Sequence, residues 1–423
     1  MADYGYQTGD RHVPVRWRPS AHAGRLLTLA VAALALAVIT HRPEFAGLAA
    51  PAIVLLSTVR AARPGRLRVR IRPVDSGFAE GHPSALQVDV DGQGDYAAEL
   101  RIEPGEAITP GPAVVIPGPA HVLLPFTAQR WGRRQVGMLA ITLRDRYRLT
   151  EGSTRLGLPW IDCRPEPAHL TRTILLSRLP SRLGEHPSRA TGEGSEFVGV
   201  REFVPGDRQR RINWPATTRR GSIHLSTFAA ERIQNVVVIA DATADVGEPG
   251  ASSLDLVLRG ATGVMGRYLA DRDRVGLVMY ASRLNWVAPG QGERHFQRLL
   301  DLLMSSPGGS DKAAGFTRLP RAALPPGSLI VVFSPLLDAG LVEAVRDVRE
   351  RGFSVVIIDV LNSEPGDDGS KISGLARRVW RLEQQAIRFA MLELGVPVVH
   401  WDGRSSLDGP LARYTRKVMV VRR

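Results

Sequence analysis

The sequence has a single cysteine, Cys163, among its 423 residues. One cysteine excludes an internal disulfide framework and any zinc site built from cysteines. Aromatic residues make up only 6% of the chain, but the apolar fraction of 44% is that of an ordinary folded protein. The length is enough for two or three domains.

Signatures of common enzymes and nucleic-acid binders are also missing. The chain has no Gly-x-Ser-x-Gly, no Walker loop and no His-Glu-x-x-His motif. It also lacks zinc spacing, an aromatic–basic sheet motif and a basic helix with heptads. A net charge of +13 suits nucleic acid and anionic lipid equally. Because no nucleic-acid module is present, we do not expect nucleic acid as a partner.

Two apolar runs lie near the start of the chain. Residues 1–20 are polar and basic, and we expect them to be flexible. The runs at 26–40 and 45–59 each have about 15 residues, short of the roughly 20 that cross a bilayer, but small flanking residues extend both. We predict a transmembrane hairpin over residues 21–63, with helices at about 24–41 and 44–62. A signal peptide is the alternative for the first run.

Arginines orient the predicted hairpin. Arg16, Arg18 and Arg25 stand before its apolar part, and a series of arginines that begins at Arg60 follows it. Only Arg42 and a histidine lie between the two helices. By the positive-inside rule, both ends face the cytoplasm. We therefore expect the soluble domains to be cytoplasmic.

Two further segments have different periodicities. Residues 66–165 show short runs of alternating apolar and polar residues divided by turns, which predicts a β-sandwich. Residues 166–193 are typical of a linker and contain one strand-like run, at 173–179. We find no catalytic constellation in the sandwich, so a spacer or interaction role is expected.

Residues 235–423 alternate between strand and helix patterns. Continuous apolar runs at 236–240, 329–333 and 354–360 are separated by helix-periodic segments, including a closing one at 409–420. This pattern predicts a parallel sheet covered by helices on both faces, whose ligands bind at the carboxyl ends of the strands. The stretch 371–388 interleaves cations with apolar residues and predicts a helix with a solvated basic face.

The most distinctive stretch is residues 194–234. Pro205-Gly206-Asp207 is a turn signal, and Trp214 follows a cluster of arginines. Cation–π stacking of the indole or an Asp207–Arg211 ion pair would be natural there. In a purely structural alternative, Asp207, Arg211 and Trp214 form a buried ion pair with an aromatic lid.

This stretch closely resembles the signature of the family called domain of unknown function 58. The signature reads Gly-x-Glu-Phe-x-x-Leu-Arg-Glu-Tyr-x-Pro-Gly-Asp, followed by x-x-Arg-x-Ile-Asp-Trp and a small-small-Arg tail. The chain departs from it at Val200, Phe203, Asn213 and the Thr217-Thr218 pair. The matching residues are Glu196, Phe197, Arg201, Glu202, Pro205, Gly206, Asp207, Ile212, Trp214 and Arg219.

The resemblance implies a fold, a location and a partner. Relatives resemble a von Willebrand factor A-like domain joined to a membrane hairpin in the inner membrane of bacteria, and tend to be paired with a MoxR-type AAA+ ATPase. The chain would then be a membrane-anchored, non-enzymatic adaptor in envelope or complex assembly. We expect its docking surface to include Arg201, Glu202, Asp207, Arg211 and Trp214.

Asp241-Ala-Thr243-Ala-Asp245 stands at the end of the first strand of the α/β segment. It resembles the Asp-x-Ser-x-Ser loop of von Willebrand factor A-like domains, which holds a divalent cation through one carboxylate and two hydroxyls. Hard oxygen ligands suit Mg²⁺. Asp245, however, replaces the second serine.

The other two loops of that pattern are altered. The chain reads Ser334-Pro335 where Ser-Asp is expected, with Asp338 further on, and the middle threonine has only loose candidates such as Thr317. We therefore expect no obligatory cofactor. Mg²⁺ at a degenerate site is one reading, and a hydrogen-bonded strand terminus without metal is the other.

Two other functions remain open from the sequence. A metal-dependent hydrolase could use Asp241 and Asp245, but the sequence offers no nucleophile–base pair for it. A basic surface could bind anionic lipid or nucleic acid, and such binding would depend steeply on salt. The sequence leaves the oligomeric state open.

Overall fold

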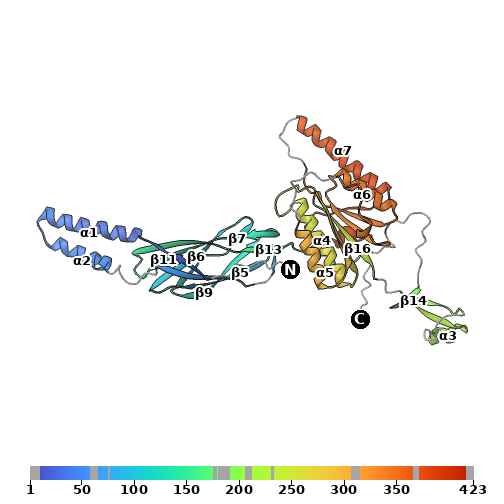
Figure 1. The fold of residues 1–423 in the computed structure, drawn as a ribbon, viewed down its shortest axis with the longest axis horizontal. Coiled ribbons are helices and arrows are strands. Elements are labelled where there is room, and N and C mark those ends of the chain that lie inside the picture. Colours follow the sequence, from blue (N-terminus) through green and yellow to red (C-terminus); the bar gives the residue numbers. More distant parts are fainter. Residues whose placement is uncertain are drawn as a thin grey trace. The chain divides into compact units, whose positions relative to one another are not determined.

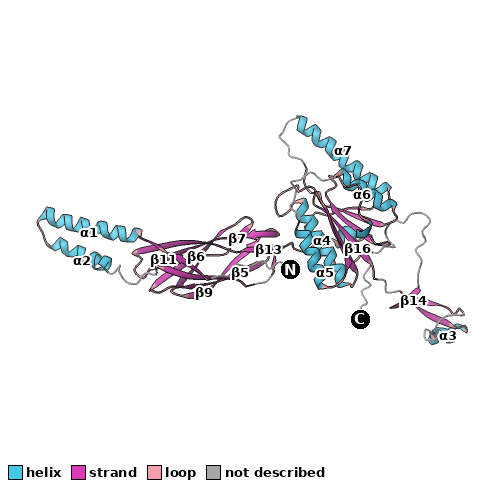
Figure 2. Ribbon diagram, viewed as in Figure 1, coloured by secondary structure: helices cyan, strands magenta, loops and turns pink. Residues whose placement is uncertain are grey.

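The structure is a computed structural model that describes residues 10–57, 65–74, 77–174, 179, 191–204, 212–229, 233–305, 315–364 and 371–415. The chain divides into two compact units, Met1–Glu166 and Pro167–Arg423, and each is considered by itself. Figure 1 follows the elements along the sequence, and Figure 2 separates helices from strands. The prediction of several domains, with an apolar N-terminal helix and a strand-rich domain, is confirmed.

The apolar runs form helices α1 (Ala21–Thr40) and α2 (Glu44–Ser57). They pack through Ala30, Ala49 and Ala52, while larger side chains such as Ile39, 75% exposed, point away. By length and composition, α1 is long and apolar enough to cross a membrane, and α2 is shorter. The predicted continuation of the second helix, at 58–62, lies outside the described residues.

In the segment expected to be flexible, the described part, residues 10–20, contains two strands. β1 (Arg11–Pro14) pairs with β3 (Arg66–Pro73), and β2 (Arg16–Pro19) pairs with β12 (Thr150–Gly157). Their half-buried Val13 and Trp17 pack on the sandwich core. Val13, Val15 and Trp17 do alternate with Pro14, Arg16 and Arg18, but the run is short, and its prolines and arginines are also typical of a flexible tail.

The sandwich consists of two five-stranded antiparallel sheets, ordered β1-β3-β5-β9-β7 and β2-β12-β11-β6-β8, beside a small sheet β10-β13-β4. Side chains of the two large sheets share one core, which includes Cys163. Burial raises the pKa of that thiol to about 12, so it stays protonated. The remaining strands are β4 (Phe78–Ala79), β5 (Pro83–Asp91), β6 (Tyr96–Pro104), β7 (Ile108–Pro110), β8 (Val114–Pro117), β9 (Ala120–Ala128), β10 (Gly132–Gln135), β11 (Gly137–Asp145) and β13 (Trp160–Arg164).

The second unit is built on a six-stranded sheet ordered β18-β17-β16-β19-β20-β21. All neighbouring strands are parallel except β17 and β18. The strands are β16 (Asn235–Asp241), β17 (Arg274–Tyr280), β18 (Leu284–Gly290), β19 (Leu329–Ser334), β20 (Ser354–Asp359) and β21 (Val398–His400). The sequence pattern did not predict β18, since Pro289 and Gly290 at its end are typical of an edge strand or a turn rather than of a central strand.

Helices cover both faces of this sheet (Figure 2). α6 (Ala339–Glu350) and α7 (Lys371–Glu393) pack on the face that carries Val237 and Ile330. α4 (Ser253–Ala270) covers the other face, where Gly260 lies against the Phe333 ring. α5 (Glu293–Met304) packs beside α4.

The end of the chain differs from its prediction. Instead of a helix at 409–420, the structure has the short α8 (Asp408–Leu411), followed by a turn and a β-bridge between Thr415 and Ile174. Thr415 pairs with Ile174 where the prediction had further helical turns, and the local sequence pattern does not show such a contact between distant segments. Residues 416–420 lie outside the described part of the chain.

Candidate functional site

The carboxyl edge of the six-stranded sheet brings together polar residues from neighbouring strands. β16 ends at Asp241 and β19 ends at Ser334, and these strands are paired. The chain adds β17 on one side of β16 and later places β19 on the other. In open α/β sheets, ligands bind where the strand order reverses in this way. These residues therefore form the candidate site.

The Asp241 side chain is fully buried and hydrogen-bonded at both oxygens. Oδ1 accepts from the Thr243 amide at 3.0 Å and from the Thr243 hydroxyl at 2.7 Å. Oδ2 accepts from the Ser334 hydroxyl at 2.5 Å, and Ser334 Oγ in turn accepts from the Leu336 amide at 2.8 Å. Burial raises the pKa of Asp241, and the hydrogen bonds from Ser334 and Thr243 lower it.

The other residues predicted for this site lie apart from that cluster or serve another purpose. Asp245 and Thr317 are exposed. Asp338 caps α6 by accepting from the Leu341 amide at 2.8 Å, and it also accepts from the Tyr280 hydroxyl at 3.1 Å. Sequence analysis missed the role of Ser334, whose only signal was a hydroxyl directly after a buried strand.

This geometry does not fit a magnesium ion. Mg²⁺ demands near-octahedral oxygen ligands, whereas both oxygens of Asp241 accept protein hydrogen bonds and Asp338 is held as a helix cap. The described residues contain no group of three or more His, Cys, Asp or Glu side chains that could hold a metal. The hydroxyls of Thr243 and Ser334 instead connect the ends of β16 and β19 through Asp241.

A second buried carboxylate, Asp359, ends β20 on the same edge. Its Oδ1 accepts from the Leu361 amide at 3.0 Å, and its Oδ2 lies 2.6 Å from Nη2 of Arg388 on α7. Burial raises the pKa of Asp359, and Arg388 partly offsets that effect. Arg388, Gln384 and His400 border a cavity of about 350 Å³.

The signature stretch forms a small unit of β14 (Thr191–Glu202), β15 (His224–Ala229) and the short helix α3 (Trp214–Arg220). Asn213, which replaces the aspartate of the family pattern, caps α3 by accepting from the Ala216 amide at 3.0 Å. It also donates to Ser226 Oγ at 3.0 Å. Asparagine therefore keeps the capping role and adds a donor that ties α3 to β15.

The structure places only part of the predicted docking surface. Trp214 is 67% exposed at the start of α3, whereas the aromatic-lid alternative needs a buried indole. Arg201 and Glu202 are exposed on β14, and Arg219 is exposed in the last turn of α3. The expected Asp207–Arg211 ion pair lies outside the described residues, as do Pro205, Gly206 and the side chains of Glu196 and Phe197.

An exposed apolar surface lies along α7. Leu375, Val379, Leu382 and Phe389 are between 48% and 65% exposed, and we call them the α7 row. Their spacing places them on one side of the helix, while Ile387 and Met391 face the sheet core. The sequence predicted a solvated basic face here; the structure shows that the solvated side carries large apolar groups as well.

Comparison with known proteins gives a family match over part of the chain and no activity. The model of the family described as "Protein of unknown function DUF58" matches residues 199–369, from β14 to just past β20. The similar curated proteins are uncharacterized ones from Mycobacterium bovis and Mycobacterium tuberculosis, each 26% identical over 181 residues. The match covers 42% of this chain and 51% of those proteins, so the chain spans about half the length of the curated relatives it matches.

Proposed function

We propose that this chain is a membrane-anchored, non-enzymatic adaptor that docks a MoxR-type AAA+ ATPase through a von Willebrand factor A-like domain. α1 supplies the anchor, together with α2 if the second helix continues across the bilayer. The arginines around these helices favour cytoplasmic soluble domains in a bacterial inner membrane. ATP and the ATPase would be on that side.

The observation that carries the proposal is the α7 row. Soluble proteins rarely leave adjacent large apolar side chains in water, and such surfaces mark interaction sites. The row lies beside the exposed Arg378 and the guanidiniums of Arg377 and Arg381, which share Glu364. A partner surface that is apolar at its centre and acidic at its edge would complement it.

The carboxyl edge supports an adaptor better than a hydrolase. A hydrolytic site needs a carboxylate that can reach substrate or activate water. Asp241 is inaccessible and accepts hydrogen bonds at both oxygens, and Asp359 is 1% exposed and paired with Arg388. Asp241 instead connects the ends of β16 and β19, and Asp359 connects the end of β20 to α7.

Replacing Trp214 with alanine is expected to reduce recovery of the ATPase at least about tenfold, because an exposed tryptophan at a docking surface is a typical binding hot spot. The measurement is affinity co-purification from native membranes with Mg²⁺ and ATP. Trp160→Ala is the matched control, since Trp160 is 53% exposed on the sandwich.

Equal recovery from both variants would remove Trp214 from the docking surface. Thermal unfolding should be unchanged in each variant, because neither indole is buried. Raising the salt concentration distinguishes docking of a protein partner from the remaining alternative, a basic surface that binds lipid or nucleic acid. A basic surface that binds lipid or nucleic acid loses affinity steeply with salt, whereas docking through the α7 row should be less sensitive.

A further inference from the structure

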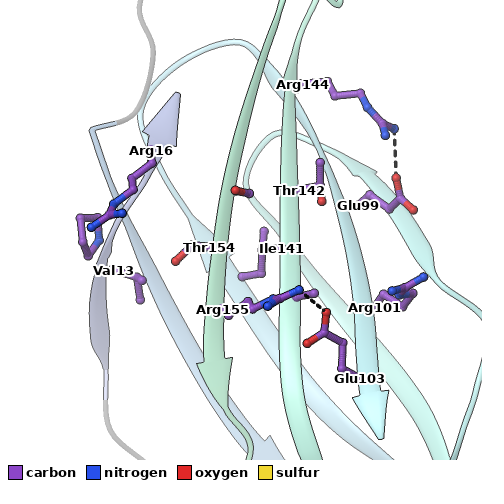
Figure 3. Close-up of a pocket in the computed structure, with 13 residues that line it drawn as sticks. Val13, Arg16, Glu99, Arg101, Glu103, Ile141, Thr142, Arg144, Thr154 and Arg155 are labelled. Carbon is purple, nitrogen blue, oxygen red and sulfur yellow. Dashed lines mark hydrogen bonds and ion pairs between the residues drawn. The ribbon is translucent and has the colours of Figure 1, made fainter. Parts of the chain in front are cut away.

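The outer face of the sheet β2-β12-β11-β6-β8 carries a groove of about 730 Å³ (Figure 3). Its floor is lined by small side chains, Ala140, Thr142 and Ser153, on the paired strands β11 and β12. A groove of this size is in the range of small-molecule sites. All of its lining residues belong to the first compact unit.

The charged residues of the groove leave an excess of positive charge. Four arginines and two glutamates line it. Arg144 Nη1 lies 3.0 Å from Glu99 Oε2, and Arg155 Nη2 lies 3.0 Å from Glu103 Oε1, as Figure 3 shows. Each glutamate is thus engaged by one arginine. Arg16 and Arg101 remain, and neither has an ion pair or side-chain hydrogen bond within the described ranges.

The guanidiniums of Arg16 and Arg101 lie on opposite sides of the groove (Figure 3). Arg16 is on β2 and Arg101 is on β6, with β12 and β11 between them. Arg16 is in register with Glu99, two residues from Arg101, so three strand spacings of about 4.8 Å and this offset place the two backbones about 16 Å apart. Between them stand the hydroxyls of Thr142 and Ser153, for which no side-chain hydrogen bond occurs in the described part of the chain.

We propose that this groove binds a phosphate-bearing organic molecule. Guanidinium groups form paired hydrogen bonds with phosphate oxygens, and hydroxyl donors on the floor can complete their coordination. The distance between Arg16 and Arg101 suits an extended molecule better than a single inorganic ion.

The phosphate can come from a phospholipid headgroup or from a soluble phosphate ester. β2 leads directly into α1 through Ser20, whose amide donates to the Leu149 carbonyl at 2.9 Å. Arg16 precedes Ser20 by four residues, or about 13 Å of strand. A phospholipid headgroup could therefore reach the groove. Of the two sources, only the phospholipid depends on the proposed membrane anchor.

The test uses the full chain purified in a sugar detergent. In one arm, sn-glycerol 3-phosphate is titrated into the chain by calorimetry; in the other, native mass spectrometry counts phosphatidylglycerol retained from mixed vesicles with phosphatidylcholine. In whichever of the two measurements detects binding by the wild type, Arg101→Gln is expected to weaken that binding at least about tenfold. Arg16→Gln should act in the same direction.

Arg68→Gln is the matched control, because Arg68 is exposed on β3 of the opposite sheet. It removes the same charge and should leave binding unchanged. Equal losses in Arg68→Gln and Arg101→Gln would overturn the proposal in favour of diffuse charge, and absence of binding in both arms would also overturn it. Neither arm contains a partner protein, so failure here is distinct from failure of the adaptor proposal.

Discussion

Replacing Ser334 with alanine is expected to destabilise the α/β unit by about 3 kcal/mol at neutral pH. The substitution removes the donor to Asp241 Oδ2 and leaves a buried carboxylate oxygen without that partner. It also removes the acceptor for the Leu336 amide. The measurement is hydrogen exchange of the β16 and β19 amides in the full chain.

The effect should depend on pH in a defined direction. Burial holds the pKa of Asp241 above its usual value, and loss of Ser334 raises that pKa further. A raised carboxyl pKa in the folded state costs stability as the pH rises above the unfolded value of about 4. The difference between variant and wild type is therefore largest at neutral pH and shrinks towards pH 4.

Ser328→Ala is the matched control for this prediction. Ser328 is equally buried, but its hydroxyl donates to the neutral Pro325 carbonyl at 2.6 Å. The control should cost about 1 kcal/mol with little pH dependence. If the two serine variants had equal costs at every pH, Asp241 would not be the group that Ser334 stabilises.

Replacing Arg388 with methionine is expected to destabilise the same unit by about 2 kcal/mol. Asp359 is 1% exposed, and removal of Arg388 leaves its Oδ2 without a counter-ion. The cost stays below that of a fully buried pair because the Arg388 side chain is 37% exposed and water can replace it in part. Exchange of the β20 amides measures the loss.

Arg381→Met is the control on the same helix. Arg381 pairs with Glu364 at 2.7 Å, but both side chains are more than 40% exposed, so the change should leave the stability of the unit almost unchanged. Asp359→Asn in the Arg388→Met background should recover part of the loss, because it removes the buried charge. No recovery would mean that Arg388 acts through packing of its aliphatic part.

Hydrophobic periodicity predicted the strands that are buried on both faces or on alternate residues. The strands β16 and β19 consist of consecutive apolar residues, and a period of two marked the strands of the sandwich. Asp241 and Thr243 could be placed together because they follow one strand. β2 and β18 were missed, since proline or glycine ends each of these runs and each strand depends on a neighbouring strand for its conformation.

Contacts between segments far apart in the sequence could not be predicted from the sequence. Ser334 was interpreted as part of a broken metal loop, because only the pairing of β19 with β16 brings its hydroxyl to Asp241. The spacing of the α7 row was visible, but which side of the helix packs on the sheet is a tertiary property. The groove combines Arg16, Glu99 and Ser153 through strand register alone.

Photo-crosslinking from α7 in native membranes tests the adaptor proposal most directly. A photoreactive residue at Leu382, in the middle of the α7 row, should attach an AAA+ ATPase subunit. The same residue at Leu123, 59% exposed on β9 of the sandwich, should not. Recovery of the ATPase from position 382 only is the predicted result. Crosslinking to no ATPase at position 382, or to the same one equally at both positions, would contradict it.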